Sequence, residues 1–289
     1  MKYAVIQEQR LQHTVVILCR TLGVSEQGYY AWRQRPQSRR AYERQRLGDQ
    51  VQLIFADNKK RYGSPRIYRE LKDQGQRCSE KRVARLMRQR GLKAKAARKY
   101  RVTTDSTHGK SVAANLLNRE FSPDQPNKVW AGDITYIWTD EGWLYLAVFL
   151  DLFARKIVGW ALSTRLQSNL VALAFTRAIV RRQPGAELMV HTDQGSQYVA
   201  SEFKQALKQH RITLSMSRRG NCWDNAVVES FFHSFKVEAI HGERFRTRWE
   251  LEREVFDYIE RFYNPKRRHS SIDYCSPEDY ERRAASRVA

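Results

Sequence analysis

The sequence predicts an α/β fold in which a mixed five-stranded sheet with flanking helices is preceded by all-α helix-turn-helix units. Three observations predict this fold class. Apolar stretches of strand length follow one another from residue 129 to residue 162, and shorter strand-like stretches then alternate with helical periodicity. Residues 1–101, by contrast, show helical periodicity between serine and glycine caps. With 289 residues, 42% of them hydrophobic, the chain can form two domains and a substantial core.

The charge of the chain is large and concentrated at its front. The 52 basic residues exceed the 31 acidic ones, for a net charge of +21. Residues 1–110 hold an excess of 18 positive charges, whereas residues 111–289 hold an excess of only 3. Such a concentration predicts attraction to a polyanion, and basic residues that recur on predicted helices favour nucleic acid over a membrane surface.

Other classes of protein are disfavoured by what the sequence lacks. It has no apolar stretch of 18 residues and no long apolar core at its start, so we expect no membrane span and a cytoplasmic, nucleoid-associated protein. The cysteines lie far apart without CxxC spacing, which argues against a zinc module and a disulfide framework. We expect reduced thiols at Cys19, Cys78, Cys222 and Cys275.

Residues 1–40 are predicted to form a helix-turn-helix-like segment. An apolar helix begins near Val15, Leu22-Gly23-Val24 makes a turn, and Ser25 caps a second helix through Trp32. This unit is either a DNA reader or a small helical hairpin with a packed aromatic face.

Residues 41–101 are predicted to form a helix-turn-helix DNA-binding domain. Ser64 caps a helix that ends near Gly75, and Ser79 caps a second helix that ends at Gly91. The second helix has an outward face that is basic except for Glu80, as a recognition helix in the major groove would have. A charged face without a partner is the alternative. The expected DNA contacts are Arg66, Lys81, Arg82, Arg85, Arg88, Lys93, Lys95, Arg98 and Lys99.

A polar, turn-rich linker over residues 102–127 leads to a catalytic core predicted over residues 128–240. Strands are expected at 129–138, 143–151, 156–162, 188–191 and 212–215. Helices are expected over about 170–178, 199–209 and 224–238. A C-terminal helix striped from Leu251 to Phe262 and a basic tail fill residues 241–289. Three antiparallel strands followed by alternating helices and strands give a mixed sheet.

Three acidic residues are predicted to converge on this layout. Asp133 lies in the first strand, Asp193 just beyond the fourth, and Glu229 in the helix after the fifth. Three carboxylates brought together repel one another unless a cation lies between them, and Mg²⁺ prefers oxygen ligands. Two such ions can activate a water or a DNA 3′-hydroxyl and stabilise the leaving oxygen. Asp151, a rival carboxylate, is explained by the turn before Arg155 and is left out.

The strings around these acids resemble a known family. Trp130-Ala-Gly-Asp133-Ile-Thr-Tyr, His191-Thr-Asp193-Gln-Gly-Ser-Gln-Tyr198 and Gly220-Asn-Cys-Trp-Asp-Asn-Ala-Val-Val-Glu229 resemble the catalytic core of bacterial insertion-sequence transposases related to retroviral integrases. So does the tail from Tyr263 to His269, and the likeness extends over residues 45–280. The resemblance implies a ribonuclease H-like fold, Asp133, Asp193 and Glu229 as catalytic ligands of Mg²⁺ or Mn²⁺, and a contact of Lys236 with the transposon end.

Several neighbouring residues have competing interpretations. His191 either orients the site or, as we expect, packs beneath it, and His233 is expected to be an ordinary exposed histidine. Gly195 is predicted to permit the tight turn that exposes Asp193. We expect core positions rather than base-stacking platforms for Trp130, Tyr136, Trp143 and Trp160.

The resemblance also implies partners. Double-stranded DNA, as element ends and target, would be bound by a homodimer or higher oligomer, because two ends must be brought together. Members of the family are often made as a fusion of an upstream DNA-binding product to a downstream catalytic one, and this chain resembles the downstream product. The expected function is Mg²⁺-dependent 3′-end cleavage and strand transfer. The alternatives are a catalytically idle DNA-binding regulator and, less favoured, a structure-selective nuclease.

Overall fold

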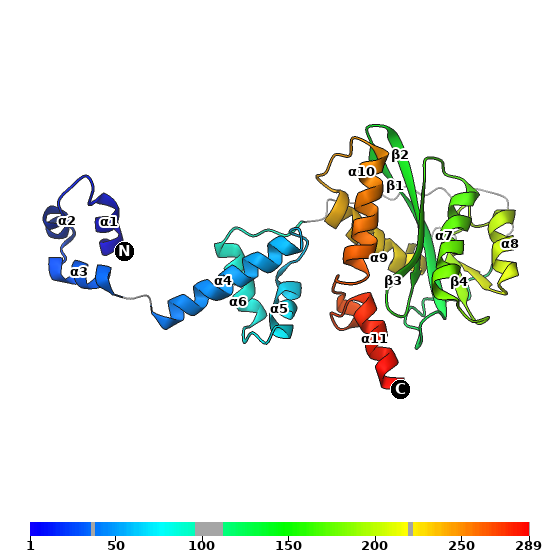
Figure 1. Cartoon of the computed structure of the whole chain (residues 1–289), viewed down its shortest axis with the longest axis horizontal. Coiled ribbons are helices and arrows are strands. Elements are labelled where there is room, and N and C mark those ends of the chain that lie inside the picture. The colour runs from blue at the N-terminus through cyan, green and yellow to red at the C-terminus, as the bar shows by residue number, and fades with distance from the viewer. Residues whose placement is uncertain (36–37, 96–111, 219–221, 289) are drawn as a thin grey trace.

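The computed structural model describes residues 1–35, 38–95, 112–218 and 222–288 (Figure 1). Two of the expected DNA contacts, Arg98 and Lys99, fall outside these residues, as do residues 102–111 of the predicted linker and part of the loop before residue 222. Across the described ranges, no helix is both long enough and apolar enough to cross a membrane.

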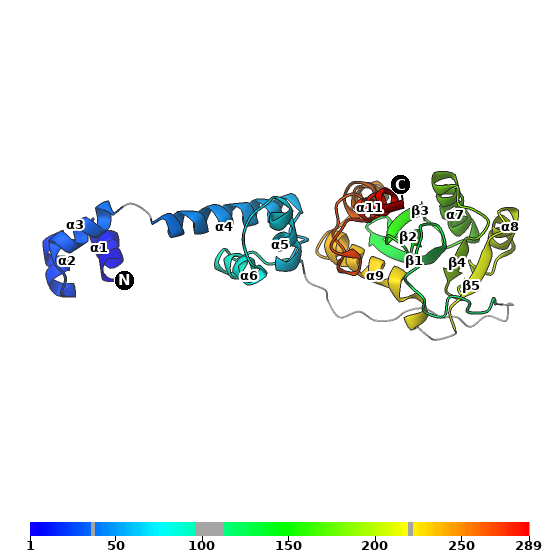
Figure 2. The ribbon, with the colours of Figure 1, turned by 90° about the horizontal axis from the view of Figure 1, so that it is seen from below.

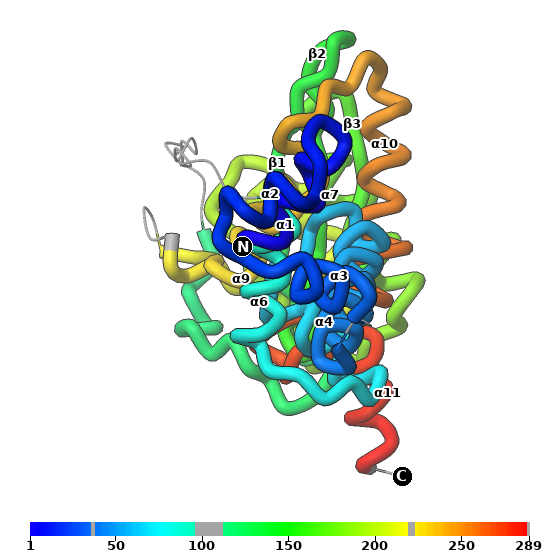
Figure 3. Tube along the Cα trace, turned by 90° about the vertical axis from the view of Figure 1, so that its left-hand side faces the viewer, coloured from blue at the N-terminus to red at the C-terminus, as the bar shows by residue number. Residues whose placement is uncertain are grey.

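A small three-helix unit begins the chain and lies nearest the viewer in Figure 3. Its helices are α1 (Lys2–Gln9), α2 (Val15–Leu22) and α3 (Glu26–Gln34). Gly23 adopts the left-handed φ of 62° after α2, and the Ser25 hydroxyl accepts the Gly28 N–H at 3.0 Å, so the predicted turn and cap are confirmed. Helix α1 was not predicted, because its apolar residues are consecutive in sequence and do not line one face of the helix.

A second helical unit has three helices instead of the two predicted. They are α4 (Arg39–Asp57), α5 (Ser64–Asp73) and α6 (Glu80–Gln89). The long α4 was missed because its buried residues lie only in its second half, from Leu47 to Phe55. Ser79 caps α6 as predicted and accepts the Arg82 N–H at 3.3 Å. The predicted cap of α5 was wrong by one residue, since Gly63 is the cap and Ser64 the first helical residue.

The sheet has the predicted five strands in the order β3-β2-β1-β4-β5. The strands are β1 (Val129–Thr139), β2 (Gly142–Asp151), β3 (Lys156–Ser163), β4 (Met189–Thr192) and β5 (Thr213–Met216). The first three pair antiparallel, and β4 and β5 run parallel to β1. The chain therefore adds β2 and β3 on one side of β1 and β4 and β5 on the other.

Helices cover both faces of the sheet (Figures 1 and 2). One face packs against α7 (Ser168–Arg182) and α8 (Ser201–Gln209) through a core that includes Trp130 and Phe149. The other face, with Ala131 and Leu150, packs against the helical segments that end the chain. These segments are the 3₁₀ turn η1 (Cys222–Asn225), α9 (Ala226–Phe235), the π turn η2 (Lys236–Ile240), α10 (Arg248–Phe256) and the π turn η3 (Asp257–Tyr263). The single helix predicted over residues 224–238 is thus three consecutive helical types.

The second helical unit shares a core with this second face, because buried residues of α4, α5 and α6 belong to the same apolar cluster as α9 and η3. Polar contacts extend the junction. The Tyr62 hydroxyl donates to the Lys266 carbonyl at 3.0 Å, and Arg268 pairs with Glu70 at 2.7 Å. The α4–α6 unit is therefore fixed on the C-terminal part of the chain.

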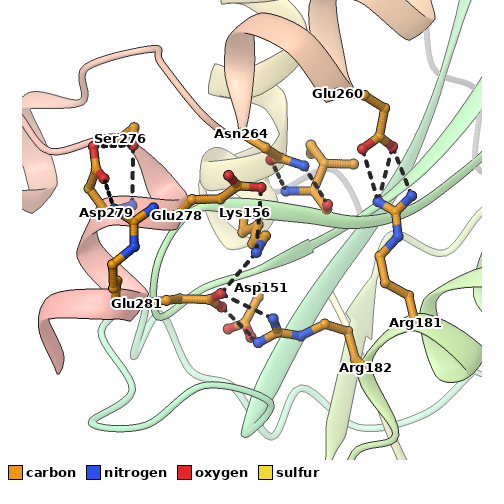
Figure 4. A network of polar contacts seen from close by, with 12 residues as sticks. Asp151, Lys156, Arg181, Arg182, Glu260, Asn264, Ser276, Glu278, Asp279 and Glu281 are labelled. Carbon is orange, nitrogen blue, oxygen red and sulfur yellow. Dashed lines mark hydrogen bonds and ion pairs between the residues drawn. The ribbon is translucent and has the colours of Figure 1, made fainter. Parts of the chain in front are cut away.

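The C-terminal segment ends in a helix rather than in the predicted tail alone. After η4 (Ser270–Ile272), α11 (Pro277–Val288) is capped by Ser276, whose hydroxyl accepts the Asp279 N–H at 3.2 Å. Figure 4 shows how polar contacts attach it: Glu281 accepts from Lys156 at 3.0 Å and from Arg182 at 2.7 Å. In the same network Asp151 caps the β2–β3 turn, accepting the Phe153 N–H at 3.0 Å, which explains this carboxylate without a role in the site.

Candidate active site

Two of the three candidate carboxylates lie side by side through the register of the sheet. The parallel ladder of β1 and β4 runs from Val129 opposite Met189 to Gly132 opposite Thr192, and Asp133 and Asp193 are the next residues on the two strands. Adjacent strands lie about 4.8 Å apart, and residues at matching positions of parallel strands point to the same face. The two aspartates therefore meet where β4 ends.

The backbone around each aspartate fixes its side chain. The Gly195 N–H donates to Asp193 Oδ1 at 2.9 Å, and the Ile134 N–H donates to Asp133 Oδ1 at 2.7 Å. An added Cβ at Gly195 would lie only 2.9 Å from Asp193 Oδ1. Gly195 has an ordinary φ, so glycine is needed here for this close approach rather than for a left-handed backbone.

Glu229 lies exposed in the first turn of α9, near enough for its charge to act on Asp133, and the residues before that helix fix the start of the helix. Asn225 donates to the Gly132 carbonyl at 3.3 Å, which joins the start of α9 to the strand residue next to Asp133. Asp224, 1% exposed, accepts from Arg218 and Arg119 at 2.9 Å each. The sequence analysis missed this support, because nothing in the sequence distinguishes Asp224 from a surface acid.

The carboxylates are close enough to affect one another's protonation. Burial raises the pKa of Asp133 well above its ordinary value, and the negative charges of Asp193 and Glu229 add to this rise. Burial and the charge of Asp193 likewise raise the pKa of Glu229. Mutual repulsion in a set of oxygen donors is the condition that a divalent cation relieves, so the residues fit Mg²⁺. As the described residues stand, however, no three acidic, histidine or cysteine side chains form a group that could hold one ion.

Lys236 lies at the end of α9, close to Asp133. Burial lowers the pKa of its ammonium group, and the negative charge of Asp133 opposes this shift. Its Nζ lies 5.8 Å from the centre of the Tyr136 ring, within cation–π range. A cation at this position can bind a phosphate beside the carboxylates.

Buried side chains form the floor of the site. His191 is fully buried, with Nδ1 2.8 Å from the Ser215 hydroxyl and Nε2 3.2 Å from the Ser217 hydroxyl. The expectation that it packs beneath the site is confirmed. Tyr198 is 1% exposed. Burial raises the pKa of its phenol, and the negative charges of the nearby Asp133 and Asp193 raise it further.

His191 should make stability depend on pH. Burial lowers its pKa from 6.5 to about 4, so between these values the unfolded chain binds a proton that the folded chain does not. The free energy of unfolding is therefore highest, as far as His191 is concerned, above pH 6.5. It falls by at most about 3 kcal/mol as the pH is lowered toward 4. We expect urea unfolding from pH 7 to pH 4.5 to show a smaller acid loss in His191→Gln than in the wild type. The exposed His233→Gln is the control, and equal losses in His191→Gln and the wild type would contradict the assignment.

Two aromatic residues were placed wrongly by the sequence analysis. Trp130 is fully buried, as expected, but Tyr136 is 40% exposed and Trp143 is 43% exposed. The reason is the reach of the β1–β2 hairpin. Its pairing extends from Trp130 to Thr139, whereas β4 pairs with β1 only as far as Gly132, so the aromatic end of the hairpin projects beyond β4.

The expected DNA contacts fall into two groups. Lys81, Arg85 and Arg88 are exposed on α6, as is Lys93 after it, and Arg82 is half-buried. Arg66 instead pairs with the buried Glu238 at 3.2 Å, and Lys95 pairs with Glu243 at 3.0 Å. Arg66 and Lys95 were predicted to contact DNA phosphates, but each is paired with an acid more than 140 positions away in the sequence.

Comparisons with known proteins agree with this organisation. The sequence matches the HTH-like domain family over residues 43–100 and two families described as integrase core domain, over residues 123–222 and 229–284. Transposase InsF for insertion sequence IS3A of Escherichia coli (strain K12) is 45% identical over 283 residues, which cover 97% of this chain and 98% of the relative. The transposase for insertion sequence element IS904 of Lactococcus lactis subsp. lactis (strain IL1403) is 46% identical over 246 residues, covering 85% and 97%.

Two retroviral integrase cores are among the solved structures that match part of the chain. The HTLV-2 integrase catalytic core domain in complex with magnesium is 16% identical with a TM-score of 0.39, covering 54% of this chain and 97% of its own. The catalytic core domain of BIV integrase is 18% identical with a TM-score of 0.41, covering 56% and 99%. The strand order and the integrase core matches confirm the predicted fold class, a ribonuclease H-like sheet with flanking helices after helix-turn-helix-like units.

Proposed function

Because the chain belongs to the insertion-sequence transposases of the IS3 type, we propose that it cleaves the 3′ ends of its element in a Mg²⁺-dependent reaction and joins them to another DNA. The observation that carries the proposal is the placement of Asp133 and Asp193 at matching positions on adjacent parallel strands, with Glu229 close enough to raise the pKa of Asp133. In both steps the attacking oxygen, from water or from a DNA 3′-hydroxyl, would displace the leaving oxygen at phosphorus directly, so no covalent protein intermediate is needed.

The three carboxylates would hold the metal. When bound, a pair of Mg²⁺ ions supplies activation of a water or of a 3′-hydroxyl and charge stabilisation of the leaving oxygen. Asp133 and Asp193 would contribute oxygen ligands whose orientation is fixed by backbone N–H groups, and Lys236 would bind a phosphate of the element end. Glu229 is exposed at the start of α9, so its side chain is free to rotate and would complete the set from there.

The direct test is a cleavage and joining assay. Purified protein, DNA carrying the element's terminal repeat and Mg²⁺ should yield nicked 3′ ends and joined strands, and chelation of the metal should stop both. Binding of the repeat without cleavage, and without any heat of Mg²⁺ binding in calorimetry, would support the alternative, an idle DNA-binding regulator. Cleavage that depends on DNA shape and not on the repeat would support a structure-selective nuclease.

The α4–α6 unit is proposed to read DNA through α6. Replacing Arg85 and Arg88 with glutamine should weaken binding to terminal-repeat DNA at least tenfold, because each lost base contact costs about 1–3 kcal/mol of binding free energy. Each lost phosphate contact should also lower the slope of log affinity against log salt concentration by about 0.9. The matched control is Arg282→Gln with Arg287→Gln, the same charge change on exposed residues of α11. Fluorescence anisotropy at several salt concentrations measures both effects. Equal losses in the two double variants would mean that α6 supplies only general charge.

The active assembly is proposed to be a dimer or larger, since two element ends must be brought together for joining. An upstream-frame DNA-binding protein, separate or fused to this chain, is a proposed partner in recognising the ends. Mass measurement of the protein with and without paired terminal-repeat DNA tests this point. A complex with one protein chain on two joined ends would contradict it.

A further inference from the structure

A cavity of about 330 Å³ lies beside α9, whose Ala226, Ser230 and Ser234 belong to its lining. It is bounded by α9, the β2–β3 turn, the start of α5 and the segment after η3. Its polar lining is basic and hydroxylic, and consists mainly of Arg66, Arg155, Ser230, Ser234, Arg267 and His269. Among the residues that the structure describes, no acidic side chain lines it.

Arg155 is the most informative residue of the cavity. Its Nη1 is buried and has no hydrogen-bond partner among the described residues, and burial lowers the pKa of the guanidinium. Asp151 is near enough to oppose this shift, but it already accepts two backbone N–H groups and pairs with Arg182 at 3.5 Å. A buried arginine donor without a partner is costly and needs an explanation.

The backbone of Arg155 determines which substitution can test its side chain. Its φ of 61° lies in the left-handed region, where glycine or asparagine is favoured in a turn. An arginine therefore occupies this position despite a backbone cost of about 1 kcal/mol or more. The turn itself does not require an arginine, so asparagine, which tolerates this backbone, can replace Arg155 in a test of the side chain.

The other charges of the cavity leave it with an excess of positive charge. Arg267 donates to both carboxylate oxygens of the buried Glu238 at 2.8 Å each, and Arg66 donates to one of them at 3.2 Å. One carboxylate thus serves two arginines, and Arg155 is a third. His269 is held neutral, because burial and the charges of these three arginines lower its pKa well below 6.5.

The mouth of the cavity is formed by exposed hydroxyl groups. Ser230, Ser270 and Ser271 are exposed, whereas Arg267 is 4% exposed at the bottom. Water takes up about 30 Å³ per molecule in the liquid, so the cavity can hold a phosphate group with several ordered waters. Planar guanidinium groups behind a ring of hydroxyl donors suit the oxygens of a phosphate.

We propose that this cavity binds one phosphate group of a DNA strand that passes the active site. The choice of DNA rests on the proposed function and on position, because Ser230 follows Glu229 directly in α9 and their Cα atoms are only about 3.8 Å apart. A strand bound beside Glu229 would pass Ser230 at the mouth, which would bring another of its phosphates to the cavity. The chemistry that recognises it is a phosphate anion, which free inorganic phosphate shares.

The first test measures binding of inorganic phosphate by calorimetry, in the full chain without metal or DNA. The variant is Arg155→Asn, because asparagine tolerates the left-handed backbone and the fold should keep its melting temperature or gain from the change. We expect phosphate affinity to fall at least tenfold. The matched control is Arg211→Asn, an exposed arginine with φ 55° beyond α8, which should leave phosphate affinity unchanged.

A second variant and a DNA measurement complete the design. Ser271→Asp puts a negative charge at the exposed mouth and should also weaken phosphate binding tenfold, unlike Ser286→Asp on α11. For duplex DNA, Arg155→Asn should lower the slope of log affinity against log salt by about 0.9, the value for one phosphate contact. These readouts do not depend on cleavage, so a protein inactive in strand transfer could still pass them.

The outcomes separate the sources of the anion. Loss of phosphate binding together with the lower salt slope supports the proposal. Loss of phosphate binding with an unchanged slope overturns the assignment to DNA and leaves a site for a free anion. A wild type that does not bind phosphate, with a slope unchanged in Arg155→Asn, overturns the site itself.

Discussion

Replacing Asp193 with asparagine is expected to abolish cleavage and joining while leaving DNA retention largely intact. The carboxamide keeps the shape and can still accept the Gly195 N–H, but it lacks the negative charge that a Mg²⁺ ligand in this set supplies. Loss of one preorganised electrostatic group costs up to about 10³-fold in rate, and loss of a metal ligand should cost at least as much. The measurement is a strand-cleavage time course beside a DNA-binding isotherm.

The matched control for this variant is Asp140→Asn, the same chemical change at the β1–β2 turn, where Asp140 pairs with the exposed Arg244. Activity of Asp140→Asn should be unchanged. If Asp193→Asn cleaved and joined strands at the wild-type rate, the assignment of the site would fail.

Asp193→Asn should not lower the stability of the metal-free protein, although it abolishes activity. The folded-state pKa of Asp133 is raised above its ordinary value of 3.8, so the folded chain keeps a proton there that the unfolded chain has lost. Stability of the metal-free protein therefore falls as the pH rises from about 4 through that raised pKa. Asp193→Asn removes one cause of the rise, so in chelator at pH 7 it should melt no lower than the wild type.

The second large effect is expected at Glu238, whose carboxylate joins η2 to the α4–α6 unit and to the C-terminal segment. Glu238→Gln leaves Arg267, 4% exposed, without its charge partner and also weakens the contacts of Arg66 and Tyr258. Loss of one partner of a buried pair costs about 3–5 kcal/mol. For a chain of this size we expect the melting temperature to fall by roughly 10 °C.

The pH dependence of this contribution has the ordinary sign for an acid. Burial raises the pKa of Glu238, but the hydrogen bonds and charge of Arg267 outweigh it and the pKa is lowered below 4.5. The stabilisation is therefore present above pH 4.5 and is lost as acid protonates the carboxylate. The control is Glu43→Gln in the exposed pair with Arg39, which should cost less than about 1 kcal/mol. Equal melting temperatures for Glu238→Gln and Glu43→Gln would contradict the assigned role.

The sheet and the neighbouring positions of Asp133 and Asp193 could be predicted because their signals are local. Period-two alternation and apolar runs predicted β1 to β3, and the expected strand order put Asp133 beside Asp193, as the register of β1 and β4 has it. α4 was missed because a helix whose first half is exposed lacks the apolar stripe that predicts one. The contacts and exposure of residues that pack against segments distant in the sequence were also predicted wrongly.

Arg66 and Tyr136 illustrate that second limit. Arg66 reads as a DNA contact in sequence, but its partner Glu238 lies 172 residues away and only the docking of α5 onto the core reveals it. Tyr136 reads as a core aromatic, but the hairpin that carries it extends past the end of β4. Arg155 likewise has no sequence signal, since its significance comes from an unpaired buried donor and a left-handed backbone.

Asp133, Asp193 and Glu229 are proposed to hold divalent ions together, and the decisive experiment is a crystal structure with Mn²⁺ and terminal-repeat DNA, phased on the anomalous signal of the metal. We expect anomalous peaks between the two aspartates and Glu229, at ligand distances of about 2.1 Å, with the signal absent in Asp193→Asn. An active complex whose Mn²⁺ peaks lie away from these side chains, or persist unchanged in Asp193→Asn, would contradict the account.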